Sequence, residues 1–176
     1  MPGYVQALLC MRLIMNEMIY IGKTVSTFGI KGELKVISDF EFCDKAYKIN
    51  NKILINNIEH IISGVRYHKN YILLKIDNLE NINDILKYVG YNIYIKLLDL
   101  NLSKDEYLYK DLIDSIVLDD DGSNLGKIVE VINGHNVLLR VKKDKEFLLP
   151  LIENYVIKFD KDKKILYTKE AKNLII

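Results

Sequence analysis

The apolar residues of this chain come in short runs from Ile19 onward, and Gly, Asn and Asp separate one run from the next. Short runs rich in β-branched residues, bounded by turn formers, are typical of strands joined by tight turns. The chain is therefore expected to be mainly β. In its first half the runs predict strands over Ile19–Val25, Glu33–Ser38, Lys52–Ile55, Ile58–Tyr67 and Tyr71–Ile76.

One segment changes period and predicts a short helix. Its apolar residues follow the i, i+3, i+4, i+7 spacing of a helix face: Ile82, Ile85, Leu86 and Val89. Asn81 is expected to cap the start of this helix, and Gly90 to end it. Because Tyr91–Ile95 then alternates like a closing strand, we expect a first β-barrel with one short helix over residues 18–97.

A second strand-rich unit is expected over residues 107–168, after a short polar linker at 98–106 and before a tail at 169–176. Its strands are predicted at Ile113–Leu118, Leu125–Ile132, Val137–Val141, Glu146–Leu149 and Lys164–Tyr167. Short strands with turns at this spacing favour a second small barrel.

Asparagine marks three of the predicted hairpin turns. They lie at Asn56-Asn57, at His68-Lys69-Asn70 and at Asn133-Gly134. Asn and Gly tolerate the left-handed backbone that tight hairpins need, and Asn-Gly is a strong signal of this kind.

Composition and charge exclude several classes of protein. Hydrophobic residues make up 49% of the chain and charged residues 28%, which excludes a disordered polymer. Lys and Arg number 25 against 24 Asp and Glu, so no whole-molecule field attracts a polyanion. Arginine occurs only at Arg12, Arg66 and Arg140, so bidentate groups for phosphate are scarce. A general nucleic-acid binder is therefore disfavoured.

The cysteines and the amino-terminal residues indicate a cytoplasmic protein. Cys10 and Cys43 are far apart and have no ligand-spaced partners, which argues against a zinc site and a disulfide framework. The apolar stretch Val5–Met15 is interrupted by Arg12 and is too short to span a bilayer. We therefore expect residues 1–17 to be an extension outside the fold, with no membrane contact.

No catalytic or metal-binding set can be assembled from the sequence. His60, His68 and His135 have no partners at a recognisable catalytic spacing. The acidic run Asp119–Gly122 lacks the glycine position of a calcium loop, so an ordinary turn is favoured. We expect no enzyme activity, no cofactor and no metal.

Two short segments are candidates for binding. Gly29-Ile30-Lys31-Gly32 resembles a backbone-clamping GxxG loop, although it joins two predicted strands and is favoured as a structural turn. Lys23, Lys31 and Lys35 near it could touch phosphate. Tyr107-Leu108-Tyr109 follows the linker, where its aromatic rings could anchor a partner or wedge the two units together.

The order of these motifs resembles the RimM family of ribosome maturation factors over roughly residues 19–168. In the first unit the similarity rests on Ile21–Val25 and Thr27–Val36. In the second unit it rests on an ordered set: Tyr107, Asp111–Ile113, Leu125–Ile128, Leu149–Ile152, Val156 and Asp160.

The resemblance implies a translation-factor-like barrel followed by a PRC barrel, in a protein without catalysis. It implies binding to the precursor of the small (30S) ribosomal subunit, chiefly through ribosomal protein S-nineteen of the subunit head, with help in head assembly and 16S rRNA processing. It also implies a cytoplasmic monomer with at most a weak rRNA contact. The implied partner-binding residues are Tyr107, Leu108, Tyr109 and Asp111.

This chain departs from the family pattern at single positions. The family usually has His where Phe28 stands, Arg at Ile82, Tyr at Leu108 and Gly at Asp114. A second function stays open: an rRNA-binding accessory barrel that acts through the Gly29–Gly32 turn. An enzyme that uses a small-molecule cofactor has little support, because no phosphate-cradling loop precedes a helix.

Overall fold

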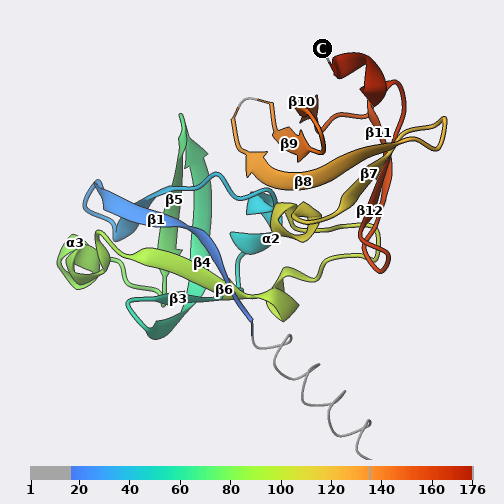
Figure 1. Cartoon of the computed structure of the whole chain (residues 1–176). Coiled ribbons are helices and arrows are strands. Elements are labelled where there is room, and N and C mark those ends of the chain that lie inside the picture. Colours follow the sequence, from blue (N-terminus) through green and yellow to red (C-terminus); the bar gives the residue numbers. More distant parts are fainter. Residues whose placement is uncertain (1–16, 135, 176) are drawn as a thin grey trace, which may run out of the picture. The chain divides into compact units, whose positions relative to one another are not determined.

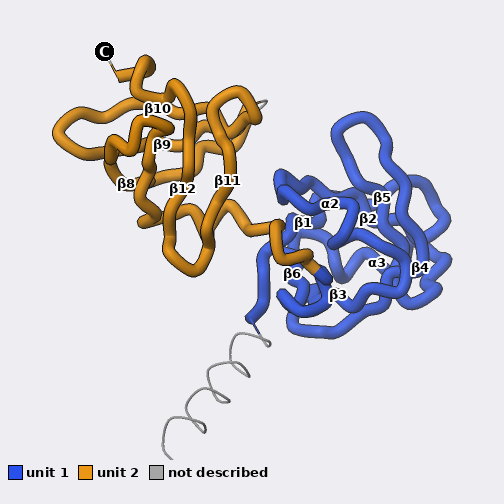
Figure 2. Tube along the Cα trace, turned by 90° about the vertical axis from the view of Figure 1, so that its right-hand side faces the viewer, with its two compact units in different colours: residues 1–101 blue, residues 102–176 orange. Residues whose placement is uncertain are grey.

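A computed structural model describes residues 17–134 and 136–175 of the chain. The expected extension at residues 1–17 lies outside these residues except for Glu17, and so do Cys10 and His135. The chain divides into two compact units between Asn101 and Leu102 (Figure 2). Both units are built mainly of strands, which confirms the predicted fold class.

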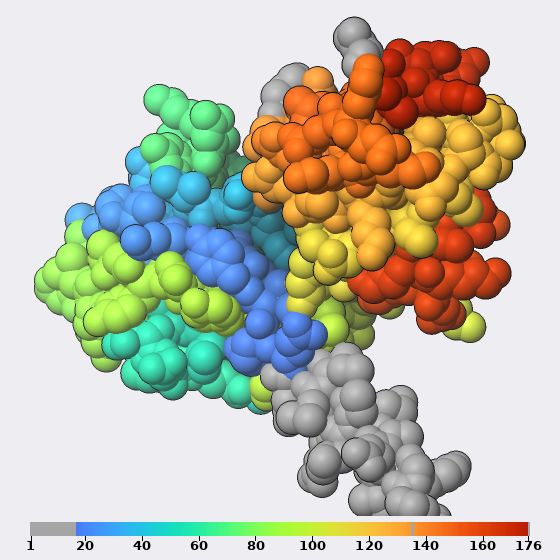
Figure 3. Space-filling model, in the orientation of Figure 1, coloured from blue at the N-terminus to red at the C-terminus, as the bar shows by residue number. Residues whose placement is uncertain are grey.

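The first unit, as described over residues 17–101, is a closed barrel of antiparallel strands (Figure 1). Its strands are β1 (Met18–Phe28), β2 (Glu33–Ile37), β3 (Lys52–Ile55), β4 (Ile58–His68), β5 (Tyr71–Ile76) and β6 (Asn92–Lys96). They follow the order β1-β2-β5-β4-β3-β6, and β6 pairs with β1 again. The hairpin of β4 and β5 projects beyond the rest of the unit (Figure 3).

Alternation along the strands explains why this sheet closes. Leu34 and Val36 of β2 are fully buried, whereas Lys35 between them points away from the core. The β3 strand repeats the pattern with buried Ile53 and Ile55. Because each strand carries one apolar face, rolling the sheet into a barrel collects these faces around a single core.

The predicted Asn56-Asn57 turn is confirmed. Both residues have left-handed φ angles, 51° and 60°, and the flanking pair Ile55–Ile58 closes the hairpin. In the turn from β4 to β5 the left-handed residue is Lys69, with a φ of 54°, rather than the expected Asn70. Here the twist of the flanking strands, rather than the preference of a residue, decides which position adopts positive φ.

The predicted helix is present but shorter than expected. It consists of α3 (Ile82–Ile85) followed by the 3-10 turn η1 (Leu86–Tyr88). The cap is confirmed, because the Asn81 side chain accepts a 2.9 Å hydrogen bond from the backbone N–H two residues on. Leu86 was predicted on the buried face but is exposed, and Tyr88 is buried instead. The tighter 3-10 winding rotates the later side chains relative to an α-helix.

Two short elements of the first unit were not predicted. One is α2 (Cys43–Ala46), which Tyr47 follows; the buried Tyr47 hydroxyl donates a 2.8 Å hydrogen bond to the carbonyl of Ile21 on β1. Burial raises the pKa of this phenol. The other is the 3-10 turn η2 (Leu97–Leu100), in which Leu100 is buried.

The second unit, over its described residues, holds a six-stranded sheet. Its strands are β7 (Ile116–Leu118), β8 (Asn124–Ile132), β9 (Leu138–Lys142), β10 (Glu146–Pro150), β11 (Val156–Asp160) and β12 (Ile165–Thr168). Their order is β10-β9-β8-β7-β12-β11, and all neighbours are antiparallel except β7 and β12. The parallel pair joins the last strand of the unit to its first.

Two expectations for this unit need correction. The sequence analysis did not predict β11. Ile157 and Lys158 are both exposed, so buried and exposed side chains do not alternate along this strand. The strand predicted from Ile113 begins only at Ile116, since residues 109–112 form the 3-10 turn η3. The hairpin that Asn133-Gly134 predicted is present between β8 and β9, and its ladder ends at the pair Ile132–Leu138, so the connection is longer than two residues. Burial of the inward side chains sets that register, and the loop accommodates the residues left over.

Candidate functional site

The predicted partner-binding segment lies at the start of the second unit. Tyr107 packs edge-to-face on Phe159 of β11, with ring centroids 4.9 Å apart, and Leu108 is buried. Tyr109, at the start of η3, is partly buried against the same core. Burial raises the pKa of the Tyr107 hydroxyl. The two tyrosines therefore pack on the core of their own unit, and only part of each tyrosine remains accessible.

Asp111 is held by contacts on both its side chain and its backbone. Its carboxylate accepts hydrogen bonds from the Leu108 N–H at 3.2 Å and from the Lys161 ammonium at 2.8 Å. Its carbonyl oxygen accepts a 2.7 Å hydrogen bond from the ammonium of Lys164. Asp111 thus ties η3 to the turn between β11 and β12.

The predicted Gly29–Gly32 segment is the turn between β1 and β2. Both glycines have left-handed φ angles, 60° and 69°. A Cβ on Gly29 would meet no atom within 4 Å, whereas one on Gly32 would overlap the carbonyl oxygen of Leu79. Between them, Ile30 is 78% exposed and Lys31 is exposed as well. The backbone of Gly32 is therefore a packing contact, and the tip of the turn is open to solvent.

The three candidate lysines lie on the outside of the barrel but have different neighbours. The Lys35 ammonium lies 3.7 Å from the centre of the Tyr71 ring on β5. Lys23 pairs in register with Asn92 on β6, which adjoins β1 on the side away from β2. Lys31 stands at the turn. The sequence placed these residues in one cluster, whereas the barrel distributes them over three surroundings.

A polar hollow of about 460 Å³ opens beside Lys23. We call it the Asn–Tyr hollow, and its lining residues are Lys23, Asn56, Asn57, Gly90, Tyr91, Asn92 and Tyr94. Sequence reasoning singled out only Lys23 as a binding candidate. The signal available in the sequence was the concentration of amide and aromatic residues in Gly90–Tyr94.

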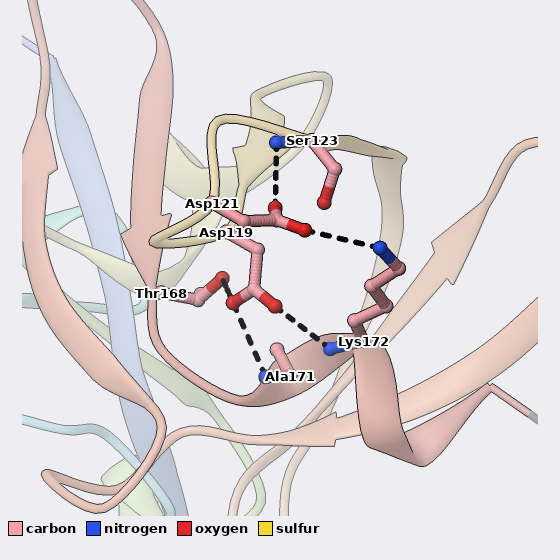
Figure 4. A network of polar contacts seen from close by, with 6 residues as sticks. All are labelled: Asp119, Asp121, Ser123, Thr168, Ala171 and Lys172. Atoms are coloured by element: carbon pink, nitrogen blue, oxygen red, sulfur yellow. Dashed lines mark hydrogen bonds and ion pairs between the residues drawn. The ribbon is translucent and has the colours of Figure 1, made fainter.

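Asp119, from the acidic run, is buried and holds the carboxyl-terminal segment of the chain (Figure 4). Its carboxylate accepts hydrogen bonds from the Thr168 hydroxyl at 3.0 Å and from the backbone N–H groups of Ala171 and Lys172 at 3.2 and 3.1 Å. The latter two open the 3-10 turn η4 (Ala171–Leu174). Asp119 therefore acts as an anchor for residues that the sequence assigned to a tail.

Asp121 stands on the outer side of the same network. It accepts a 2.8 Å hydrogen bond from the Ser123 N–H and a 3.0 Å one from the Lys172 ammonium. These hydrogen bonds, with those from Ser123 contributing most, lower the pKa of Asp121 to about 2. In the described ranges, no three His, Cys, Asp or Glu side chains converge in a way that could hold a metal ion.

The structure pairs histidines that look isolated in the sequence. His60 is buried, its Nδ1 contacts the Asp77 carboxylate, and its ring lies 4.5 Å from that of Tyr88. His68 packs beside Phe28, with ring centroids 5.3 Å apart.

Among the described helices, none is long and apolar enough to cross a membrane.

Both units match domains of known proteins. The RimM N-terminal domain model matches residues 19–100, and the PRC-barrel domain model matches residues 104–174. Ribosome maturation factor RimM of Staphylococcus haemolyticus is 32% identical over 162 residues, which cover 88% of this chain and 97% of the relative. The chain belongs to the RimM family. The same factor from Staphylococcus aureus strain MRSA252 is 33% identical over 156 residues, or 84% of this chain and 93% of the relative.

Two solved RimM structures are also similar. RimM of Pseudomonas aeruginosa is 23% identical, with a TM-score of 0.44, and covers 89% of this chain and 99% of its own. The N-terminal domain of RimM from Thermus thermophilus is 13% identical, with a TM-score of 0.43, and covers 49% of this chain and 96% of its own.

One departure from the RimM pattern has a direct structural reading. Asp114, where the family usually has Gly, adopts a left-handed φ of 66°. Its N–H donates a 2.9 Å hydrogen bond to the carbonyl of Ile128, so the backbone keeps this conformation in a paired position. Asp is among the non-glycine residues that tolerate positive φ best. The substitution is therefore compatible with the RimM fold.

Proposed function

We propose that this RimM-family chain binds precursors of the small (30S) ribosomal subunit and assists head assembly and 16S rRNA processing without catalysing a reaction. The observation that carries the proposal is family membership across both units. Its relatives from Staphylococcus are named ribosome maturation factors. We expect the protein to act in the cytoplasm, as a monomer, on free subunits.

We further propose that the protein contact is made by the segment from Tyr107 to Asp111, with ribosomal protein S-nineteen of the subunit head as partner. Tyr107 is packed on the second unit and Leu108 is buried, so both would position the segment. The partly exposed Tyr109 would then supply the contact area. A nearly neutral chain gains most of its affinity from such protein surface, since each phosphate contact needs its own cation.

Sedimentation of a cell extract through a sucrose gradient tests the proposal. We expect the chain in fractions that hold free small subunits and their precursors, and not on assembled ribosomes. Equal occupancy on mature ribosomes would count against a role in assembly. Accumulation of unprocessed 16S rRNA when the chain is depleted would support the processing role.

A second candidate function is direct rRNA contact through the Gly29–Gly32 turn. The exposure of Ile30 and Lys31 at its tip favours this candidate. Crosslinking of rRNA to the turn, lost in Lys31→Glu while subunit binding through the second unit persists, would support it.

A further inference from the structure

We propose that the Asn–Tyr hollow on the first barrel binds a segment of single-stranded RNA. The inference rests on the proposed role at the ribosome and adds a second contact to it, on a different unit from Tyr107–Asp111. It also assigns RNA to a surface away from the Gly29–Gly32 turn.

Segments far apart in the sequence form the hollow. Lys23 comes from β1, and Asn56 and Asn57 come from the turn between β3 and β4. Tyr91 directly precedes β6, and Asn92 is its first residue. The closed barrel places β6 between β1 and β3, which brings the three segments together. A volume of about 460 Å³ lies within the range of sites that hold small organic groups.

The aromatic rings of this surface are available for stacking. Tyr91 is 41% exposed, and Tyr20, whose ring centroid lies 5.9 Å from that of Tyr94, is 45% exposed. Exposed rings of this kind stack on bases without regard to sequence. Tyr91 and Tyr94 in the lining, with Tyr20 beside Tyr94, thus offer aromatic surface for stacking at the hollow.

The amide groups supply hydrogen-bonding capacity of both kinds. Asn56 and Asn57 are exposed at their turn, and each primary amide carries both donors and an acceptor. The Asn92 amide nitrogen donates a 3.3 Å hydrogen bond to the Tyr94 hydroxyl. The amide oxygen of Asn92 takes no part in this hydrogen bond. Unstacked bases of single strands present edges that such groups can bind, whereas paired bases do not.

The charge of the lining complements a phosphate group. Lys23 is its only charged residue, and it is exposed. Among the described residues, no carboxylate forms an ion pair with Lys23, in contrast to Lys52, which pairs with Glu59 at 2.8 Å. The lining has no Leu, Ile, Val or Met side chain, so the apolar side chains of a bound peptide would find little surface to bury. These features favour RNA over a protein segment.

Binding of the full chain to fluorescein-labelled oligo(U) and oligo(A) of about ten nucleotides tests the inference. We expect Tyr91→Ala to weaken binding about tenfold or more, and Tyr91→Phe to restore it because the ring is kept. Lys23→Gln is expected to reduce the slope of log affinity against log salt by about 0.7, the value for one phosphate contact on a single strand.

Two charge-matched controls lie on the same barrel. Lys48→Gln removes an exposed lysine that lines a different hollow, and it should leave binding unchanged. Lys31→Gln tests the turn. If Lys31→Gln changes the salt slope and Lys23→Gln does not, RNA binds at the turn and the inference is wrong. Melting curves of all variants verify that the barrel is intact.

Three further outcomes would overturn the inference. The chain binds neither oligonucleotide, it binds a duplex as tightly as the single strands, or Tyr91→Ala loses binding to a small-subunit protein while its binding to RNA is unchanged. Sucrose gradients run in parallel separate this inference from the proposed function. Subunit association without oligonucleotide binding rejects only the RNA site. Oligonucleotide binding without subunit association rejects only the ribosomal role.

Discussion

Gly32 lies directly against the backbone of Leu79: a Cβ at position 32 would overlap the Leu79 carbonyl oxygen and come within 2.9 Å of the carbonyl carbon. Gly29, three residues earlier in the same turn, faces open space. The two glycines share a left-handed backbone, so they differ only in what surrounds them.

We predict that Gly32→Ala destabilises the first barrel more than Gly29→Ala does. Alanine at a left-handed position costs about 1–2 kcal/mol, and overpacking adds about 1–3 kcal/mol at Gly32 alone. Urea unfolding of both variants measures the difference. Equal losses of unfolding free energy in the two variants would show that the backbone at Leu79 moves aside to make room for the Cβ.

The left-handed Asp114 predicts an unusual order of stabilities. Because its side chain is exposed, substitutions there report mainly on the backbone. We expect Asp114→Gly to change the unfolding free energy by less than about 1 kcal/mol, and Asp114→Val to lower it by about 2 kcal/mol. A valine variant as stable as the glycine variant would contradict the strained backbone.

Asp119→Ala is expected to lower the stability of the second unit by about 2–4 kcal/mol, because buried backbone donors of η4 lose their acceptor. The matched control is Asp120→Ala, which removes an exposed carboxylate from the same turn and should stay within about 0.5 kcal/mol. Chemical denaturation gives both values, and hydrogen exchange at Ala171 and Lys172 should quicken only in Asp119→Ala.

The two tyrosines of the partner segment should respond differently. Tyr107→Ala removes the ring that packs on Phe159 and is expected to lower the melting temperature. Tyr109→Ala is expected to weaken small-subunit binding about tenfold, the loss of one interface anchor. Melting curves and subunit pelleting of each variant distinguish the two. Normal binding by a folded Tyr109→Ala protein would refute the contact proposed for it.

The Glu33–Arg66 pair predicts a pH dependence. Arg66 forks on the Glu33 carboxylate at 2.7 and 2.8 Å, and this hydrogen bonding holds the pKa of Glu33 below its ordinary value. A lowered carboxyl pKa contributes stability above the ordinary pKa, and this contribution is lost as the pH falls through the lowered value.

Arg66→Gln should therefore be slightly less stable than the wild type at pH 7, and the effect should be small because solvent screens the half-exposed guanidinium. The difference in unfolding free energy should narrow as the pH falls from 7 through the lowered pKa of Glu33. Urea unfolding across this range checks it, and a difference that does not vary with pH would exclude the proposed linkage.

Predictions from the sequence were correct where residues close together in the chain decide the local structure. The short apolar run Glu33–Ser38 and the Asn56-Asn57 turn predicted a strand and a hairpin that are both present. The Asn81 cap was predicted for the same reason, since it involves a backbone N–H two residues away. The ordered motifs were sufficient to indicate the family, which the comparisons confirm.

By itself, then, the sequence determined the fold class and most strands, because these depend on residues a few positions apart, and it indicated the family through the order of its motifs. Only the tertiary structure decided the parallel pairing of β7 with β12 and the burial of Asp119 beneath η4. It alone brought Lys23, Asn56 and Tyr91 to one hollow. Those arrangements depend on closure of a whole sheet, which sets which distant strands become neighbours and leaves no periodic trace in the local sequence.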